Sequence, residues 1–207
     1  MIKAFSGYSL FVAAFCAALF SFTLTAPAIA ADTSLSPSAQ FVQNLGNTAL
    51  MSLTGKNINR KTREARVRDI LQKNFDVQAI GKFALGTYWR DASETQRKEY
   101  MGLFEDMIVQ TYTTRFEDYS GQQLKVTGST PSGSTDFIVD SQVIQKDGPP
   151  VNLQWRVRSK DGGLHIVDVV VEGVSMSITQ RSDFSSVIQN GGGTVDALLS
   201  SLRARKG

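Results

Sequence analysis

The spacing of apolar residues changes twice along this chain, and this change limits the folds it can adopt. Apolar residues recur every three or four positions over residues 36–120, alternate over 123–180, and return to helical spacing from residue 183 onward. A length of 207 residues fits one domain better than two. The pattern therefore predicts an α+β domain, with helices packed on one face of a curled antiparallel sheet around an apolar interior.

Two helix starts carry clear capping signals. Ser36 followed by Pro37 is typical of a first turn, and Ser93 with Gln96 three positions later predicts a capping box. The helix expected over 59–74 carries five basic residues, which indicate a solvated face or, alternatively, docking to an acidic partner or a membrane surface. The helical segments are expected over 36–50, 59–74, 77–85, 93–120, 183–188 and 194–202.

The alternating region predicts a four-stranded meander. Turn clusters at 146–149 and 160–163 separate successive strands, as in antiparallel hairpins with one packed and one wet face. We expect the last strand to run from Leu164 to Gln180 and to curl at a bulge near Gly173. The strands are expected over 124–126, 137–143, 151–157 and 164–180.

The first thirty residues have the features of a secretory signal. Lys3 precedes an apolar run over 10–22, and the sequence Ala-Pro-Ala-Ile-Ala at 26–30 resembles a cleavage site. We expect cleavage after Ala30 and a single mature domain over 31–207; the alternative is a retained membrane anchor. The protein is therefore predicted to be exported.

Motifs for metal binding and for common catalysis are missing from the sequence. One cysteine, Cys16, and one histidine, His165, exclude a disulfide framework and a two-histidine metal site. We find no nucleophile elbow, no phosphate loop and no dinucleotide fingerprint. We therefore predict neither an enzyme nor a cofactor or metal, and a net charge of +3 does not suggest nucleic acid as a partner.

Three polar residues can each be interpreted in two ways. Asp168 and Glu172 fall on the same side of a strand, and we interpret them as a solvent-side pair facing Arg156 or Arg158. The alternative is an acid and base pair. His165 is interpreted as a surface or hydrogen-bonded structural residue rather than a general base. Large aromatic residues are abundant, and periodicity alone leaves both core packing and a lined ligand cavity open.

Seven short segments stand out by their order and spacing. They are Leu-Gly-Thr-Tyr-Trp-Arg at 85–90, Glu-Gly-Val-Ser-Met at 172–176, and the segments at 96–100, 119–121, 148–151, 167–169 and 181–184. Together they resemble the MlaC/toluene-tolerance family of periplasmic phospholipid-binding proteins, and the segment at 172–176 is specific in this context. Arg115 with Phe116 and the glycine-rich loop before the last helix also resemble a hopanoid-associated branch.

This resemblance implies a cone related to NTF2-like and cystatin-like folds, with acyl chains held between helices and sheet. It further implies a monomeric periplasmic carrier that moves phospholipid between an outer-membrane lipoprotein complex and an inner-membrane MCE-type ABC transporter, maintaining outer-membrane lipid asymmetry. Alternatives are a carrier of hopanoid or another lipid, a small exported NTF2-like enzyme, and an interaction module. The inward faces predict a lipid-binding lining of Phe83, Leu85, Tyr88, Tyr100, Phe104, Ile108, Tyr112, Val139, Val143, Leu153, Trp155, Val157, Val169, Val171, Val174 and Met176.

Overall fold

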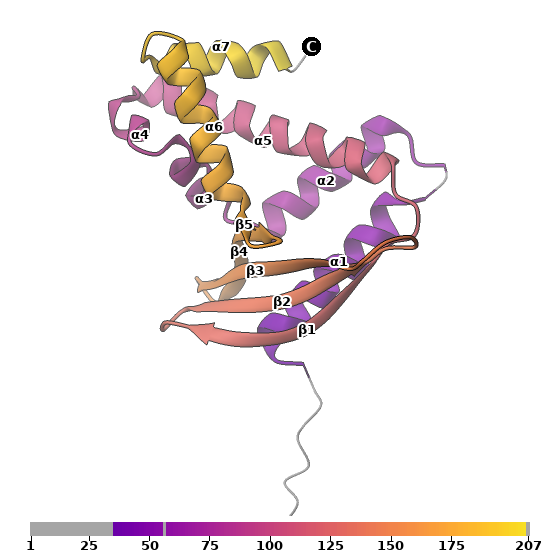
Figure 1. Cartoon of the computed structure of the whole chain (residues 1–207). Coiled ribbons are helices and arrows are strands. Elements are labelled where there is room, and N and C mark those ends of the chain that lie inside the picture. The colour runs from indigo at the N-terminus through magenta and orange to yellow at the C-terminus, as the bar shows by residue number, and fades with distance from the viewer. Residues whose placement is uncertain (1–34, 56, 206–207) are drawn as a thin grey trace, which may run out of the picture. The chain divides into compact units, whose positions relative to one another are not determined.

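The computed structural model describes residues 35–55 and 57–205, so the signal peptide expected at 1–30, with Cys16, lies outside the described residues. The described residues form one compact unit (Figure 1). Its helices are α1 (Pro37–Leu53), α2 (Arg60–Asn74), α3 (Val77–Leu85), α4 (Tyr88–Asp91), α5 (Glu94–Glu117), α6 (Met176–Asn190) and α7 (Val195–Arg205). Its strands are β1 (Gln123–Ser132), β2 (Asp136–Ile144), β3 (Val151–Lys160), β4 (Gly163–Val171) and β5 (Val174–Ser175).

The predicted helix starts are confirmed by side-chain caps. The Ser36 hydroxyl accepts a hydrogen bond from the Ala39 N–H, at 3.4 Å. The capping box of α5 is complete: the Gln96 N–H donates to the Ser93 hydroxyl at 3.2 Å, and the Ser93 N–H donates to the Gln96 side chain at 2.9 Å. The starts of these two helices therefore follow from capping residues that are close in the sequence.

The sheet is the expected antiparallel meander, in the order β1-β2-β3-β4-β5. Two irregularities interrupt its register: one between Val126 and Gly128 on β1, the other between Arg156 and Val157 on β3. Bulges of this kind bend a strand and strengthen its twist, which accounts for the curl. The bulge was expected near Gly173 instead; that residue has a φ of 80° in the turn between β4 and β5.

The prediction of a long last strand is wrong. β4 ends at Val171, and α6 already begins at Met176 rather than near residue 183. Residues 174–180 alternate in polarity, but tertiary contacts override this local signal. The Asp168 carboxylate accepts hydrogen bonds from the Ser175 hydroxyl at 2.6 Å and from the Ser177 N–H at 3.0 Å, and so holds the first turn of α6.

The basic face of α2 is only partly solvated, which corrects the expectation for this helix. Arg63 is buried, and its guanidinium donates to the Leu53 carbonyl at 3.0 Å and pairs with Glu117 of α5 at 3.3 Å. Arg68 pairs with Glu105 of α5 at 2.6 Å. These contacts fasten α2 to α5, because both carboxylates belong to α5.

Three apolar clusters fill most of the space between the elements. The first joins α3, α5, α6 and α7; the second packs α1 against the sheet; the third joins α1, α2 and α5. The helical cluster and the sheet cluster share no buried residue. The third cluster links them, because Ile108 packs against the first and third clusters and Phe75 against the second and third.

Candidate functional site

The strand residues of the predicted lining lie on one face of the sheet. The register aligns Val139 with Trp155 and Trp155 with Val169, so their side chains point the same way. Val139 and Val157 are fully buried against α1. Trp155 and Val169 are partly buried in the same cluster, and the Trp155 indole donates to the Ser141 hydroxyl at 2.8 Å.

The same face of the sheet continues beyond this cluster, and its side chains are less buried there. Leu153 is paired with Val171, and Val143 lies further along β2. All three are half-buried, and none belongs to any of the three apolar clusters. One end of the apolar face thus belongs to the cluster that includes α1, while the residues at the other end are half-buried and lie outside all three clusters.

Three helical residues of the predicted lining are enclosed by other side chains. The Tyr100 ring stacks on Phe104, with centroids 5.7 Å apart, and its hydroxyl donates to the Gly81 carbonyl at 2.9 Å. Burial raises the pKa of Tyr100. Leu85 is fully buried in the same cluster, with Tyr88 and Ile108 partly buried at its edge.

Tyr112 on α5 differs from these three residues, because 40% of its surface is exposed and it belongs to none of the three apolar clusters. The Arg115 guanidinium lies 5.8 Å from the centroid of its ring. Burial among neighbouring protein atoms raises the pKa of the Tyr112 hydroxyl, against the opposing effect of this guanidinium. Tyr112 is therefore a large aromatic side chain that the protein covers incompletely.

The remaining predicted lining residues lie at the surface. Phe83 on α3 is 42% exposed, Val174 54% and Met176 36%. Met176 was expected on a strand and is instead the first residue of α6. The sixteen residues therefore form an enclosed helical group, a group on one sheet face and a surface group, and their contact with lipid stays a prediction.

The polar candidates have structural partners. Asp168 is buried and caps α6, so the prediction that it lies on the solvent side is wrong. The register does place Asp168 opposite Arg156, while Arg158 pairs with Asp136 at 2.8 Å. Glu172 accepts a hydrogen bond from the Asn152 N–H. His165 is half-buried, and its Nδ1 atom has no hydrogen-bond partner among the described residues, so it is neither a fully exposed nor a fully satisfied residue.

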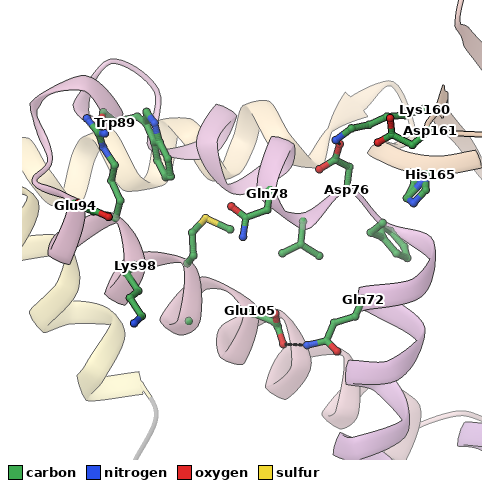
Figure 2. Close-up of a pocket in the computed structure, with 15 residues that line it drawn as sticks. Gln72, Asp76, Gln78, Trp89, Glu94, Lys98, Glu105, Lys160, Asp161 and His165 are labelled. Atoms are coloured by element: carbon green, nitrogen blue, oxygen red, sulfur yellow. Dashed lines mark hydrogen bonds and ion pairs between the residues drawn. The ribbon is translucent and has the colours of Figure 1, made fainter. Parts of the chain in front are cut away.

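A groove that the sequence did not predict runs between α2, α3, α5 and the β3–β4 turn (Figure 2). It has a volume of about 1000 Å³, and none of the sixteen predicted residues lines it. Gly102 contributes to its wall, with nothing within 4 Å of where a Cβ would stand. The one sequence signal for this groove was a glycine inside the long helix α5. Glycine lowers the stability of a helix, and no local feature of the sequence explains its presence there.

One end of the groove holds a charged pair. The Lys160 ammonium lies 3.0 Å from the Asp76 carboxylate, which also caps α3 through the Ala79 N–H at 3.0 Å. Burial opposes the charge of Asp76, but these two hydrogen bonds outweigh it and hold the pKa of Asp76 below its ordinary value. The groove therefore carries ion pairs and polar groups rather than a dry apolar surface.

Nothing in the described part of the chain suggests a metal centre or a membrane span. No group of three His, Cys, Asp or Glu side chains between residues 35 and 205, residue 56 aside, is placed to hold a metal ion. Within those same limits, no helix is both long and apolar enough to cross a bilayer.

Comparison with known families decides the classification. The family model described as MlaC protein matches residues 43–204. The chain belongs to the MlaC family. This confirms the family resemblance drawn from the motifs at 85–90 and 172–176.

Two known proteins show how far the similarity of this MlaC family member extends. The intermembrane phospholipid transport system binding protein MlaC of Haemophilus influenzae is 27% identical over 141 residues, which is 66% of this chain and 65% of that protein. The chain thus matches slightly less than two thirds of that relative's length. A phospholipid-binding protein from Ralstonia solanacearum, solved in complex with a phospholipid, superimposes with a TM-score of 0.72 at 22% identity, over 83% of this chain and 97% of that one. The likeness confirms the α+β fold with its curled antiparallel sheet.

Proposed function

We propose that this MlaC family protein is a periplasmic phospholipid carrier whose cargo inserts its acyl chains between α5 and the sheet. The observation that carries the proposal is a set of apolar side chains that the protein covers incompletely: Tyr112 on α5, 40% exposed, and the half-buried Leu153, Val143 and Val171 on the sheet. In the proposal these side chains bound one space. Hydrocarbon supplies the contacts that these side chains lack, because apolar surface is stabilised by leaving water.

The proposed lining is narrower than the sequence suggested. Ile108 and Tyr112 contribute from α5, one helical turn apart, and Leu153, Val143 and Val171 contribute from the open end of the sheet face. Tyr100, Phe104 and Leu85 already have close protein neighbours, so they support the helices that bound the space. They would contact lipid only after the helices had shifted.

The energetics explain why such a carrier is needed. Two acyl chains contain about 30 methylenes, and at about 0.8 kcal/mol each their transfer out of water is worth roughly 24 kcal/mol. A phospholipid therefore does not cross an aqueous compartment unassisted at a useful rate. A soluble protein with a dry interior, which opens at its partners, removes this barrier.

The proposal includes delivery between two membranes. The similarity to a protein named for intermembrane phospholipid transport supports it, as does the expected signal peptide at 1–30. In this scheme the carrier exchanges lipid with an outer-membrane lipoprotein complex and an inner-membrane MCE-type ABC transporter, and so helps to keep the outer membrane asymmetric. The protein is a carrier in this scheme, without a catalytic step.

Native mass spectrometry of the mature protein purified without detergent tests this function. We expect a lipid-bound species whose extra mass matches a phospholipid, identified by organic extraction and fragmentation. An unrelated cysteine-free periplasmic protein purified in parallel is the control for lipid carry-over. A lipid-free protein, or a hopanoid as the bound species, would contradict phospholipid as the cargo.

A further inference from the structure

Four apolar side chains are exposed where α3 and α6 lie side by side. Phe83 projects from α3, while Val174, Met176 and Ile178 occupy β5 and the first turn of α6. Ile178 is the most exposed of them, at 59%. None of the four lines the groove between α2, α3 and α5, and none lines a smaller hollow on the polar face of the sheet.

One cation borders this apolar surface, and a second lies close by on α3. The Arg181 guanidinium lies 5.3 Å from the centroid of the Phe83 ring, and Ile178 is three positions before it on the same face of α6. The Lys82 ammonium, next to Phe83 in the chain, lies 6.0 Å from the centroid of the Trp89 ring. We call Phe83, Val174, Met176, Ile178, Lys82 and Arg181 the α3–α6 patch.

The two cations have no carboxylate partner in the described part of the chain. Every ion pair found there uses other basic residues, those of α2, β3 and α7. Asp183 is only two positions from Arg181, but residues two apart point to different sides of a helix. The α3–α6 patch therefore combines exposed apolar side chains with two cations that no ion pair of the described residues neutralises.

We infer that the α3–α6 patch docks the protein onto the surface of an anionic lipid bilayer. Exposed aromatic and aliphatic side chains sink into the boundary between head groups and acyl chains, and neighbouring Lys and Arg attract anionic head groups. A surface outside the grooves suits a broad bilayer better than a narrow peptide segment. The inference rests on the proposed function, because a phospholipid carrier must approach membranes.

Sedimentation of the mature protein with vesicles tests this inference. The probes are vesicles of phosphatidylcholine alone and vesicles of phosphatidylcholine with phosphatidylglycerol. We expect the protein to bind the anionic vesicles, and to bind them less as salt screens the charges. The double variant Lys82→Glu/Ile178→Glu should lower this affinity by about tenfold or more, since each cation near an anionic surface contributes on the order of 1 kcal/mol.

The matched control is Met51→Glu/Lys61→Glu, which makes the same changes of residue class and net charge elsewhere. Met51 is 78% exposed on α1 and Lys61 is exposed on α2. The control should sediment like the unmodified protein, and Lys82→Gln provides a milder variant if the first pair impairs folding. Equal losses of vesicle binding in the two double variants would overturn the inference. So would the absence of any preference of the unmodified protein for anionic vesicles, and either result would assign the patch to a protein partner.

Lipid occupancy, measured by mass spectrometry on the same samples, separates this inference from the proposed function. We expect both double variants to retain their bound lipid, because neither pair belongs to the proposed lining. Vesicle binding by a protein that never carries lipid would contradict the proposed function alone. A lipid-loaded protein that ignores anionic vesicles would contradict the docking surface alone.

Discussion

At the scale of single residues, neighbours on β3 face opposite environments. Leu153 points to the open end of the apolar face, whereas Gln154 points to the polar face and donates to Asp140 at 2.9 Å. Leu153→Asn would place an unpaired amide against hydrocarbon, at a cost of about 1–3 kcal/mol. We therefore expect lipid occupancy, measured by native mass spectrometry, to fall by about tenfold. Gln154→Asn is the matched control, and equal occupancy in the two variants would contradict the proposed lining.

Asp168 shows how one buried carboxylate can set a helix boundary. Its hydrogen bonds to Ser175 and Ser177 lead us to expect that Asp168→Ala lowers the free energy of unfolding by about 2–4 kcal/mol, measured by urea denaturation. Asp183→Ala, on the exposed side of α6, should change it by less than about 0.5 kcal/mol. Similar values for the two variants would show that this cap does not hold α6.

At the scale of elements, Asp76 joins the helices to the sheet. Its N–H donates to the Ile166 carbonyl of β4 at 2.9 Å, and its carboxylate caps α3 and binds Lys160. Loss of this cap in Asp76→Ala should lower the free energy of unfolding at neutral pH by about 1 kcal/mol.

This contribution should depend on pH in a defined direction. The pKa of Asp76 is lower in the folded protein than its ordinary value of 3.8, so the ionised form favours folding. The stabilisation is complete above pH 3.8 and is lost as pH falls through the lower, folded pKa. The difference between Asp76→Ala and the unmodified protein should therefore shrink in acid. Asp69→Ala, which removes a more exposed ion pair, serves as the control. If the difference in the free energy of unfolding between Asp76→Ala and the unmodified protein grew below pH 3.8, it would contradict this role of the Asp76 carboxylate.

Helix starts and the faces of the sheet differ in how far local sequence could predict them. Ser36 and Ser93 cap helices through residues three positions away, so their helix starts could be predicted from local sequence. The start of α6 has a local cap as well, because the Ser175 hydroxyl accepts a hydrogen bond from the Ile178 N–H at 3.1 Å. The strand-like alternation after Val174 masked this signal, and the contact with Asp168 across the β4–β5 turn has no signal in the local sequence. The face of the sheet was predictable from alternation. The partial burial of Leu153 was not, since it depends on how far α1 extends over that face.

At the scale of the whole molecule, a lipid held in the interior should stabilise the fold. Binding to the folded state alone adds about 2.7 kcal/mol when free ligand is at one hundred times Kd. For a domain of this size that corresponds to a rise in Tm of roughly 5–10 °C. We expect delipidated protein to melt that much lower in a thermal scan, and added phospholipid to restore the Tm. Glycerophosphocholine, a head group without acyl chains, should not restore it; recovery with this control would contradict binding through the chains.

The distribution of packing across the molecule supports the same account. The helical cluster around Tyr100 and the sheet cluster around Val139 are built on fully buried residues, and Tyr112 and Leu153 belong to neither. Aromatic content alone could not separate core from cavity, because Tyr100 and Tyr112 have the same residue type on the same helix. Only their surroundings distinguish them.

A crystal structure of the protein as purified, without detergent or delipidation, tests the central claim most directly. The account predicts continuous acyl-chain density beside the Tyr112 ring and over Leu153 and Val171, with the head group near solvent. Well-packed side chains of the protein filling that same space, with no density for hydrocarbon, would contradict it.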